Sequence, residues 1–355
     1  MNILLTEKPS LNGYIESLLH AYQRAGHAVI CDPSNFLYSD FVPDVLHIHW
    51  PERITYWHQA LQSLSAEQQV AKAAERLAWY KARGTKIVLT IHNLVPHAAV
   101  SGSNADAALA CCLAQADIVV HHCQASVRET LQLYPAAGER ANIVCHHGDY
   151  LLQYRAVDAQ EARRRLGIPA EAFVVLNFGR QRAYKNADFV LRVFNALKVP
   201  HKFLLVAGNF DFFHHRGAEV LQLKARNWLR QRLPWRDRKF VYREIKDAEL
   251  PAFIAASDVF FLGQTRALNS GQLALAATFA KPTVYPKIGC FDEAMEGWFG
   301  EAYPAGDATA AVAALQQVRA RMESATGRPD NAAWLARNSW DAHVAGILEA
   351  LLAFR

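Results

Sequence analysis

The chain has 355 residues, of which 52% are hydrophobic and 20% are charged, and its formal net charge is +5 at pH 7. This composition excludes disordered and collagen-like chains, and no apolar run reaches the ~18–20 residues that cross a bilayer. The opening MNILLTEKPS lacks the cationic start and long apolar stretch of a signal peptide, so we expect a cytoplasmic globular protein. At roughly 100–200 residues per domain, the length predicts two domains.

Short runs rich in β-branched residues alternate with helical stretches along almost the whole chain, and each run predicts a β-strand. The predicted strands cover residues 3–6, 28–31, 45–49, 86–91, 117–121 and 142–146, followed by 173–178, 202–207, 239–242, 259–262 and 283–285. Helices are predicted between them, for example over residues 11–25, 67–83, 105–114 and 187–197. Strands separated by helices of this length form βαβ units and parallel sheets covered on both faces.

A charged helical stretch at residues 158–166 interrupts the alternation and divides the eleven predicted strands into two groups. Two groups predict an α/β protein with two doubly wound, Rossmann-like domains, whereas a single (β/α)₈ barrel needs eight strands and no interruption. We place the first domain at residues 1–155, the second at 156–335 and a C-terminal helix at 336–355.

The residues that directly follow the predicted strands of the first half are polar or aromatic, and ligands of open parallel sheets bind at this edge. They include Glu7, His92 and the run His49-Trp50-Pro51-Glu52. A histidine taken alone is more often structural than catalytic, but the agreement of so many strand ends predicts a binding site. Glu7 and Glu52 are the carboxylates best placed to act as a general base, although each could equally be a solvated loop acid.

In the second half, the segment GRQRAYKN follows the predicted strand 173–178 and leads into a helix. Arg180 offers a planar fork and Lys185 a mobile point charge, and two such cations at a strand-to-helix junction suit a diphosphate. The alternative is that both are ordinary exposed loop cations.

A second candidate anion site is the segment TRALNSGQLALAATFAKP, which follows the predicted strand 259–262. Asn269 or Ser270 can cap a buried helix that begins near Gly271 and Gln272, and the amino end of such a helix favours an anion. A routine capped core helix explains the same residues equally well.

Several common chemistries have no motif in this chain. It contains no G-x-x-x-x-G-K-[ST], no G-x-G-x-x-G after the first strand and no G-x-S-x-G. Neither His121-His122-Cys123 nor Cys145-His146-His147 has the spacing of zinc ligands, and no Asp-x-Asp occurs, so we expect no metal.

A basic run between Lys224 and Lys239 contains seven cations, one acid and two interleaved tryptophans, Trp228 and Trp235. It is either a solvated helix face or a patch that contacts anionic lipid or an anionic substrate. The mild overall charge does not indicate nucleic acid as a partner.

Taken in order, several segments resemble nucleotide-sugar-dependent glycosyltransferases of the GT-B architecture, nearest the large family that includes bacterial polysaccharide mannosyltransferases. These segments are VLTIHNLVPH, ADIVVHHCQASVRETL, IVCHHGDY, NFGRQRAYKN, DAELPAFIAASDVFFLG and NSWDAHVAGIL. The resemblance implies that the two domains face a cleft, that the first binds the acceptor and the second the donor, and that the C-terminal helix crosses back to the first domain. It also implies that His92 faces the donor sugar while Arg180 and Lys185 grip the donor diphosphate.

The chain departs from that family at its paired glutamates, whose places fall at Ala267 and Leu275. Asn269, Ser270 and Gly271 are expected to supply donor contacts instead. The loss favours an inverting over a retaining mechanism, with Glu7 as the first candidate for the base and Glu52 as the second.

The resemblance implies a metal-independent glycosyltransferase without a cofactor. It would move a hexose from a nucleoside diphosphate sugar to a hydroxyl of a glycan, with mannose from GDP-mannose favoured and a UDP-sugar as the alternative. The acceptor it implies is a lipid-linked oligosaccharide of exopolysaccharide synthesis, met by a peripheral protein at the inner membrane face. The rival interpretations are an inactive nucleotide-sugar-binding or regulatory protein, and a nucleotide-sugar epimerase or a phosphorylase on the same architecture.

Overall fold

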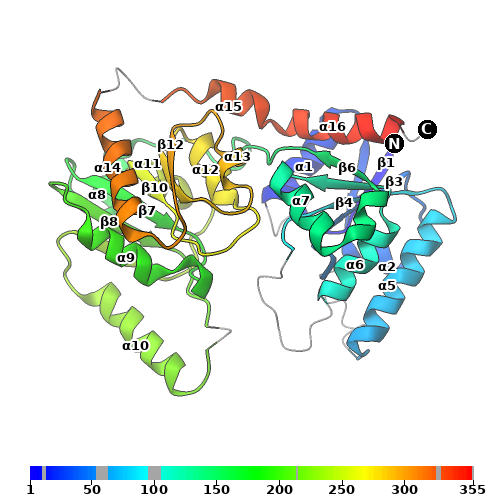
Figure 1. Cartoon of the computed structure of the whole chain (residues 1–355), viewed down its shortest axis with the longest axis horizontal. Helices are drawn as coiled ribbons and strands as arrows, with labels where there is room; N and C mark the ends of the chain where they lie inside the picture. The colour runs from blue at the N-terminus through cyan, green and yellow to red at the C-terminus, as the bar shows by residue number, and fades with distance from the viewer. Residues whose placement is uncertain (10–12, 53–62, 95–104, 213–214, 325–328, 354–355) are drawn as a thin grey trace. The chain divides into compact units, whose positions relative to one another are not determined.

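The computed structural model describes residues 1–9, 13–52, 63–94, 105–212, 215–324 and 329–353. The chain divides into two compact units, unit 1 (Met1–Gly148 with Ala336–Arg355) and unit 2 (Asp149–Leu335). Each unit contains one six-stranded sheet with helices packed on it (Figure 1). The prediction of two doubly wound parallel-sheet domains is therefore confirmed.

The sheet of unit 1 is entirely parallel and has the strand order β2-β1-β3-β4-β5-β6. Its strands are β1 (Asn2–Leu5), β2 (Ala28–Cys31), β3 (Val45–His49), β4 (Lys86–Thr90), β5 (Ile118–His121) and β6 (Ala141–Val144). Its helices are α1 (Gly13–Arg24), α2 (Pro33–Tyr38), α5 (Ala66–Lys81), α6 (Ala105–Gln115), α7 (Gln124–Leu133), the short 3₁₀ helix η2 (Pro135–Glu139) and α16 (Trp340–Ala353).

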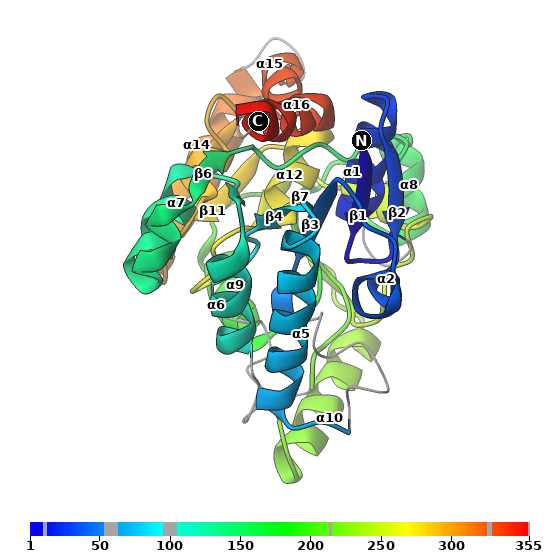
Figure 2. The ribbon, with the colours of Figure 1, turned by 90° about the vertical axis from the view of Figure 1, so that its right-hand side faces the viewer.

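One face of the unit 1 sheet is covered by α1 and α16, which come from opposite ends of the chain (Figure 2). Side chains alternate along a strand, so Ile3 and Leu5 of β1 point to this face and pack with Leu18 of α1 and Ile347 of α16. His47 and His49 have the same parity on β3 and therefore point to the α1 and α16 side as well.

The sheet of unit 2 is also parallel, with the order β12-β11-β10-β7-β8-β9. Its strands are β7 (Phe173–Phe178), β8 (Lys202–Ala207), β9 (Arg238–Val241), β10 (Val259–Phe261), β11 (Thr283–Pro286) and β12 (Gly300–Tyr303). Its helices are α8 (Ala159–Leu166), η3 (Ala183–Lys185), α9 (Ala187–Ala196), α10 (Ala218–Arg232), α11 (Leu250–Ala256), α12 (Gly271–Thr278), α13 (Phe291–Ala294) and α14 (Ala308–Ser324). The short helix α15 (Ala332–Arg337) spans the boundary between the units.

The core of unit 2 lies on both faces of its central strand, β7. Val174 and Leu176 pack with α11 and α12 on one face, while Phe173 and Val175 pack with α9 and α14 on the other. A strand buried on both faces reads as a continuous apolar run, which is why β7 was predictable to the residue. The eleven-strand prediction missed β12, an edge strand whose sequence GEAY offers only one strong β-former.

Among the described residues, no helix is both long enough and apolar enough to span a bilayer.

Candidate functional site

Histidine and aromatic side chains gather around Tyr14 of α1, beside the carboxyl edge of the unit 1 sheet. The Tyr14 ring lies 4.8 Å from the ring of His92 and 4.7 Å from that of Trp340, measured between centroids. Six histidines form what we call the histidine cluster: His47, His49, His92, His122, His147 and His343. They come from β3, from the residues after β4, β5 and β6, and from α16, so the fold collects them from the whole of unit 1.

The cluster is tied together by hydrogen bonds rather than by ion pairs. His49 Nδ1 and His92 Nε2 share a hydrogen bond of 3.0 Å, and His47 Nε2 bonds to the Thr90 hydroxyl at 2.8 Å. His343 donates from Nδ1 to the carbonyl of His146 at 2.8 Å. This network fixes the orientation of each imidazole ring.

Burial keeps five histidines of the cluster neutral at physiological pH, namely His47, His49, His122, His147 and His343. Loss of water lowers the pKa of His47 to about 3 and those of His147 and His343 to about 4. The pKa values of His49 and His122 lie well below the usual range for the same reason, reinforced by neighbouring histidines. A buried neutral cluster can accept and donate hydrogen bonds to an uncharged ligand without carrying charge itself.

The low pKa values make unit 1 sensitive to acid. An unfolded chain protonates its histidines near pH 6.5 and the folded cluster does not, so stability falls as pH drops from about 6.5 toward 4. His343 alone contributes roughly 3 kcal/mol of this loss between pH 7 and pH 4. The slope of the unfolding free energy against pH counts the protons taken up on unfolding. We expect His343→Gln to lower this number by about one between pH 6.5 and pH 4. The exposed His201→Asn is the control, and an unchanged slope in His343→Gln would contradict the assignment.

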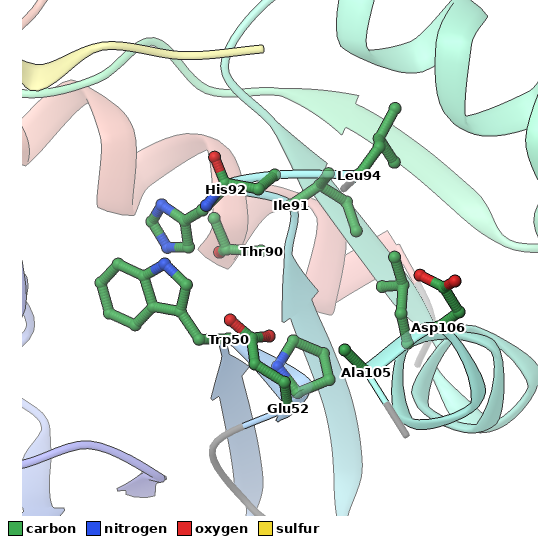
Figure 3. A pocket seen from close by; sticks show the side chains of 11 residues that line it. Trp50, Glu52, Thr90, Ile91, His92, Leu94, Ala105 and Asp106 are labelled. Atoms are coloured by element: carbon green, nitrogen blue, oxygen red, sulfur yellow. The ribbon is translucent and has the colours of Figure 1, made fainter. Parts of the chain in front are cut away.

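A small pocket opens beside the histidine cluster, between the ends of β3 and β4 and the start of α6 (Figure 3). The Trp50 indole stacks on the His92 ring at 4.1 Å with an interplanar angle of 16°. Trp50 holds a φ of 47°, a left-handed conformation that costs a non-glycine residue roughly 1–2 kcal/mol. The Glu52 carboxylate lies in the same pocket, with Asp106 on its far rim.

The two predicted base candidates sit in different surroundings. Glu52 lines the pocket with His92, as the strand-end argument expected. Glu7 lies two residues beyond the end of β1, the neighbour of β3 in the sheet, and is only 4% exposed, so it is not a solvated loop acid.

In unit 2, two polar side chains converge on Gly179 at the carboxyl end of β7. A side-chain carbon at this glycine would lie 2.8 Å from Lys185 Nζ and 2.9 Å from Gln272 Nε2. The backbone of Gly179 has a φ of +99°, which only glycine adopts without strain. The ammonium and the amide therefore lie directly over the strand end.

The Arg180 side chain does not lie over Gly179 as that of Lys185 does, but is exposed and pairs with a carboxylate. The side chain is 56% exposed and pairs with Asp211 at 3.4 Å, and Arg182 approaches the same carboxylate at 3.2 Å. Asp211 follows β8, so the cations of the β7 loop lie beside the next strand end as well. The predicted cation pair is thus one partly buried lysine over Gly179 and one exposed arginine held by a carboxylate.

A second amide, from Gln264, extends this polar group and was missed by sequence reasoning. Gln264 follows β10 and donates from Nε2 to Gln272 Oε1 at 3.0 Å, while Gln272 donates to the carbonyl of Phe178. Gln264 is 3% exposed, and its Oε1 has no hydrogen-bond partner among the described residues. Its position in the loop that follows β10 was the signal that could have found it.

The predicted capping residues lie where α12 begins. Ser270 occupies the position before the helix, and its side chain makes no capping hydrogen bond there. Asn269 and Ser270 are partly buried, and Gly271 starts the helix. In the part of the chain that the structure describes, no group of three or more His, Cys, Asp and Glu side chains is arranged to hold a metal ion.

No family model matches the chain. A D-inositol 3-phosphate glycosyltransferase of Catenulispora acidiphila is 34% identical over 120 residues, 32% of this chain and 28% of that relative. The first relatives are thus matched over less than a third of their own length. A GDP-mannose:glycolipid 4-β-D-mannosyltransferase of Xanthomonas campestris is 26% identical over 321 residues, covering 89% of this chain and 83% of the relative.

Solved structures match over the full length. Sucrose-phosphate synthase of Thermosynechococcus elongatus has a TM-score of 0.70 at 16% identity, covering 100% of both chains. HepE of Anabaena, solved with UDP and glucose, has a TM-score of 0.72 at 18% identity, covering 99% of this chain and 100% of that one. The chain has the GT-B fold of these glycosyltransferases. The family resemblance of its sequence is therefore confirmed, at the level of architecture and overall match.

In this GT-B chain, the pKa of Lys185 is lowered to about 7, first by burial and then by the neighbouring Arg182 cation. A bound diphosphate favours the charged ammonium, so binding takes up a proton when the free lysine is neutral. We expect the affinity for a diphosphate ligand at this site to be constant below pH 7 and to fall up to tenfold per pH unit above it.

Calorimetry in buffers of different ionisation enthalpy measures this proton uptake. Lys185→Arg keeps the charge at all these pH values and should bind without uptake. Binding by the wild type that is independent of pH between 6.5 and 8.5 would contradict the role of Lys185.

Proposed function

We propose that the chain is a glycosyltransferase that moves a hexose from a nucleoside diphosphate sugar to a hydroxyl of a glycan acceptor. Unit 2 binds the donor and unit 1 the acceptor. The observation that carries this proposal is the convergence of the Lys185 ammonium and the Gln272 amide on Gly179, next to the amino end of α12. A cation, amide donors and a helix amino end together suit a diphosphate that gains charge as it leaves.

GDP-mannose is the favoured donor. The Xanthomonas relative, matched over most of both chains, is named as a GDP-mannose:glycolipid mannosyltransferase. HepE of Anabaena is solved with UDP-glucose, which keeps a UDP-sugar as the alternative. A lipid-linked glycan of exopolysaccharide synthesis is the proposed acceptor, by analogy with the glycolipid in the relative's name.

Amides rather than carboxylates would contact the donor sugar. Leu275, at one of the family's two glutamate places, is 4% exposed and packs in the core of unit 2. Gln264 offers a buried amide oxygen without a partner, and Gln272 lies between it and Lys185. Amide oxygens accept hydrogen bonds from sugar hydroxyls. Unlike carboxylates, they add no negative charge that would repel the diphosphate.

Among the described residues, an ammonium and amides rather than a carboxylate converge on Gly179, so we propose a single displacement with inversion. A unit 1 carboxylate takes the acceptor proton as the hydroxyl oxygen attacks the anomeric carbon. The bond from that carbon to the diphosphate breaks, and the electron pair leaves with the diphosphate. Lys185 and Arg180 stabilise the departing charge, and no metal or cofactor is needed for this step.

The donor half of the proposal is tested by a thermal-shift screen against nucleoside diphosphate sugars, since a ligand of the native state raises its apparent stability. We expect GDP-mannose to give the largest shift and Lys185→Ala to weaken binding and turnover at least tenfold. Lys198→Ala, at an exposed lysine of the same unit, is the matched control. Wild-type binding by Lys185→Ala would remove the clamp from the mechanism.

The base is tested by Glu7→Gln and Glu52→Gln. Loss of a general base typically costs 10²–10⁴-fold in rate, so we expect Glu7→Gln to abolish transfer while the donor still binds. Glu16→Gln, at an exposed glutamate of α1, is the control. Transfer that survives in Glu7→Gln and fails in Glu52→Gln assigns the base to Glu52, and transfer in both variants rejects both carboxylates.

The same assays separate the rival functions. An inactive or regulatory protein binds the donor but releases no nucleoside diphosphate when acceptor is added. An epimerase converts the donor alone, and a phosphorylase requires inorganic phosphate. Release of nucleoside diphosphate that depends on acceptor supports the transferase.

A further inference from the structure

Helix α10 (Ala218–Arg232) carries a large apolar surface that its own unit leaves uncovered. Figures 1 and 2 show this helix at the margin of unit 2, and it packs mainly beside the edge strand β9. Asn227 is the only one of its fifteen residues that is fully buried. Leu221 is 68% exposed and Trp228 is 56% exposed, and Leu229, Leu233 and Trp235 are also exposed. Exposed leucine and tryptophan side chains at this density are typical of a contact surface.

The cations of the same stretch fall into two sets. Arg226 and Arg230 turn toward the unit and pair with Asp188 of α9, at 3.7 Å and 3.4 Å. Lys224, Arg232 and Arg236 are exposed. Arg230, which belonged to the basic run in the sequence, is therefore an internal ion-pair partner and not part of the exposed surface.

Leu221, Lys224, Trp228 and Arg232 follow one another at spacings of three or four residues, so they share one face of the helix. Residues 220–236 contain no Asp or Glu. The exposed face therefore combines apolar anchors with positive charge and has no opposing carboxylate of its own. We call Leu221, Lys224, Trp228, Leu229, Arg232 and Arg236 the α10 face.

We propose that the α10 face docks the protein on the surface of a membrane that contains anionic lipid. Tryptophan and leucine enter the boundary between headgroups and acyl chains, while lysine and arginine meet the lipid phosphates. A second copy of this chain is disfavoured as the occupant, because two such faces would bring cations against cations. The proposal goes beyond the transfer reaction, and it stands whichever sugar is the donor.

The test uses the full chain and sedimentation with vesicles of phosphatidylcholine alone or with 30% phosphatidylglycerol. We expect binding to the anionic vesicles that weakens at high salt, and little binding to the neutral ones. Each cation near the membrane surface strengthens binding roughly fivefold. Replacing Lys224, Arg232 and Arg236 by glutamine should therefore lower the partition coefficient between vesicles and water by more than tenfold. Leu221→Ser with Trp228→Ser should lower it with the cations intact.

The matched control replaces Arg164, Arg165 and Lys198 by glutamine, which removes the same charge from exposed positions outside the α10 face. It should bind anionic vesicles like the wild type. All variants should keep the thermal shift with nucleotide sugar, so failure of docking and failure of donor binding are distinguishable. The proposal is overturned if the wild type does not sediment with anionic vesicles, if the α10 variants bind as well as the control, or if they change a dimer to a monomer instead.

Discussion

The close packing of glycines at three strand ends of unit 2 sets the geometry on which its candidate site depends. A side-chain carbon at Gly208, after β8, would lie 2.1 Å from the carbonyl oxygen of Gly179, after β7. One at Gly263, after β10, would lie 2.7 Å from Val190 and 3.2 Å from the carbonyl oxygen of Lys185. An alanine at position 208 would require the backbone to move, and one at position 263 would displace the Val190 side chain. The three strand ends can therefore approach one another, and Lys185 is held where its side chain reaches back over Gly179.

The two units use the same edge of the same kind of sheet in opposite electrostatic ways. In unit 1 the edge is filled by the histidine cluster, in which burial keeps His47 and His343 uncharged, and by Tyr14, Trp50 and Trp340. In unit 2 it presents Lys185, Arg180 and Arg182, with one carboxylate, Asp211, between the arginines. Neutral imidazole and aromatic rings suit the hydroxyls and flat faces of a sugar, and cations suit a diphosphate. This contrast is the physical basis for assigning the acceptor to one unit and the donor to the other.

The sequence predicted the central strands well because their signal is local. The ranges 45–49, 173–178 and 202–207 coincide with β3, β7 and β8, since a strand covered on both faces is a continuous apolar run. The edge strand β12 was missed because three of its four residues are only partly buried, which relaxes the demand for β-branched residues. The central strands can be predicted from composition and from the periodicity of apolar residues. This signal is weaker for strands at the edge of a sheet.

The candidate sites were predictable only where they depend on one strand end. The two-residue period of a strand is enough to place His47 and His49 on the same side of the sheet. The contribution of His343, which lies 329 residues from Tyr14 and 3.4 Å from its hydroxyl, depends on how α16 packs against α1. Likewise, the link between Gln264 and Gln272 depends on where the β10 loop meets the start of α12. No spacing in a single sequence contains that information.

The lowered pKa of Lys185 follows from burial and from the neighbouring Arg182 cation. A carboxylate close to the ammonium would favour its charged form and raise its pKa, whereas the amides of Gln264 and Gln272 offer no compensating charge. Burial therefore dominates and the lysine loses much of its charge in the free protein. If a donor diphosphate supplies the negative charge, it forms an ion pair with the Lys185 ammonium. A site built in this way binds the charged leaving group most tightly when that group carries most charge, which is the condition for stabilising a transition state more than a ground state.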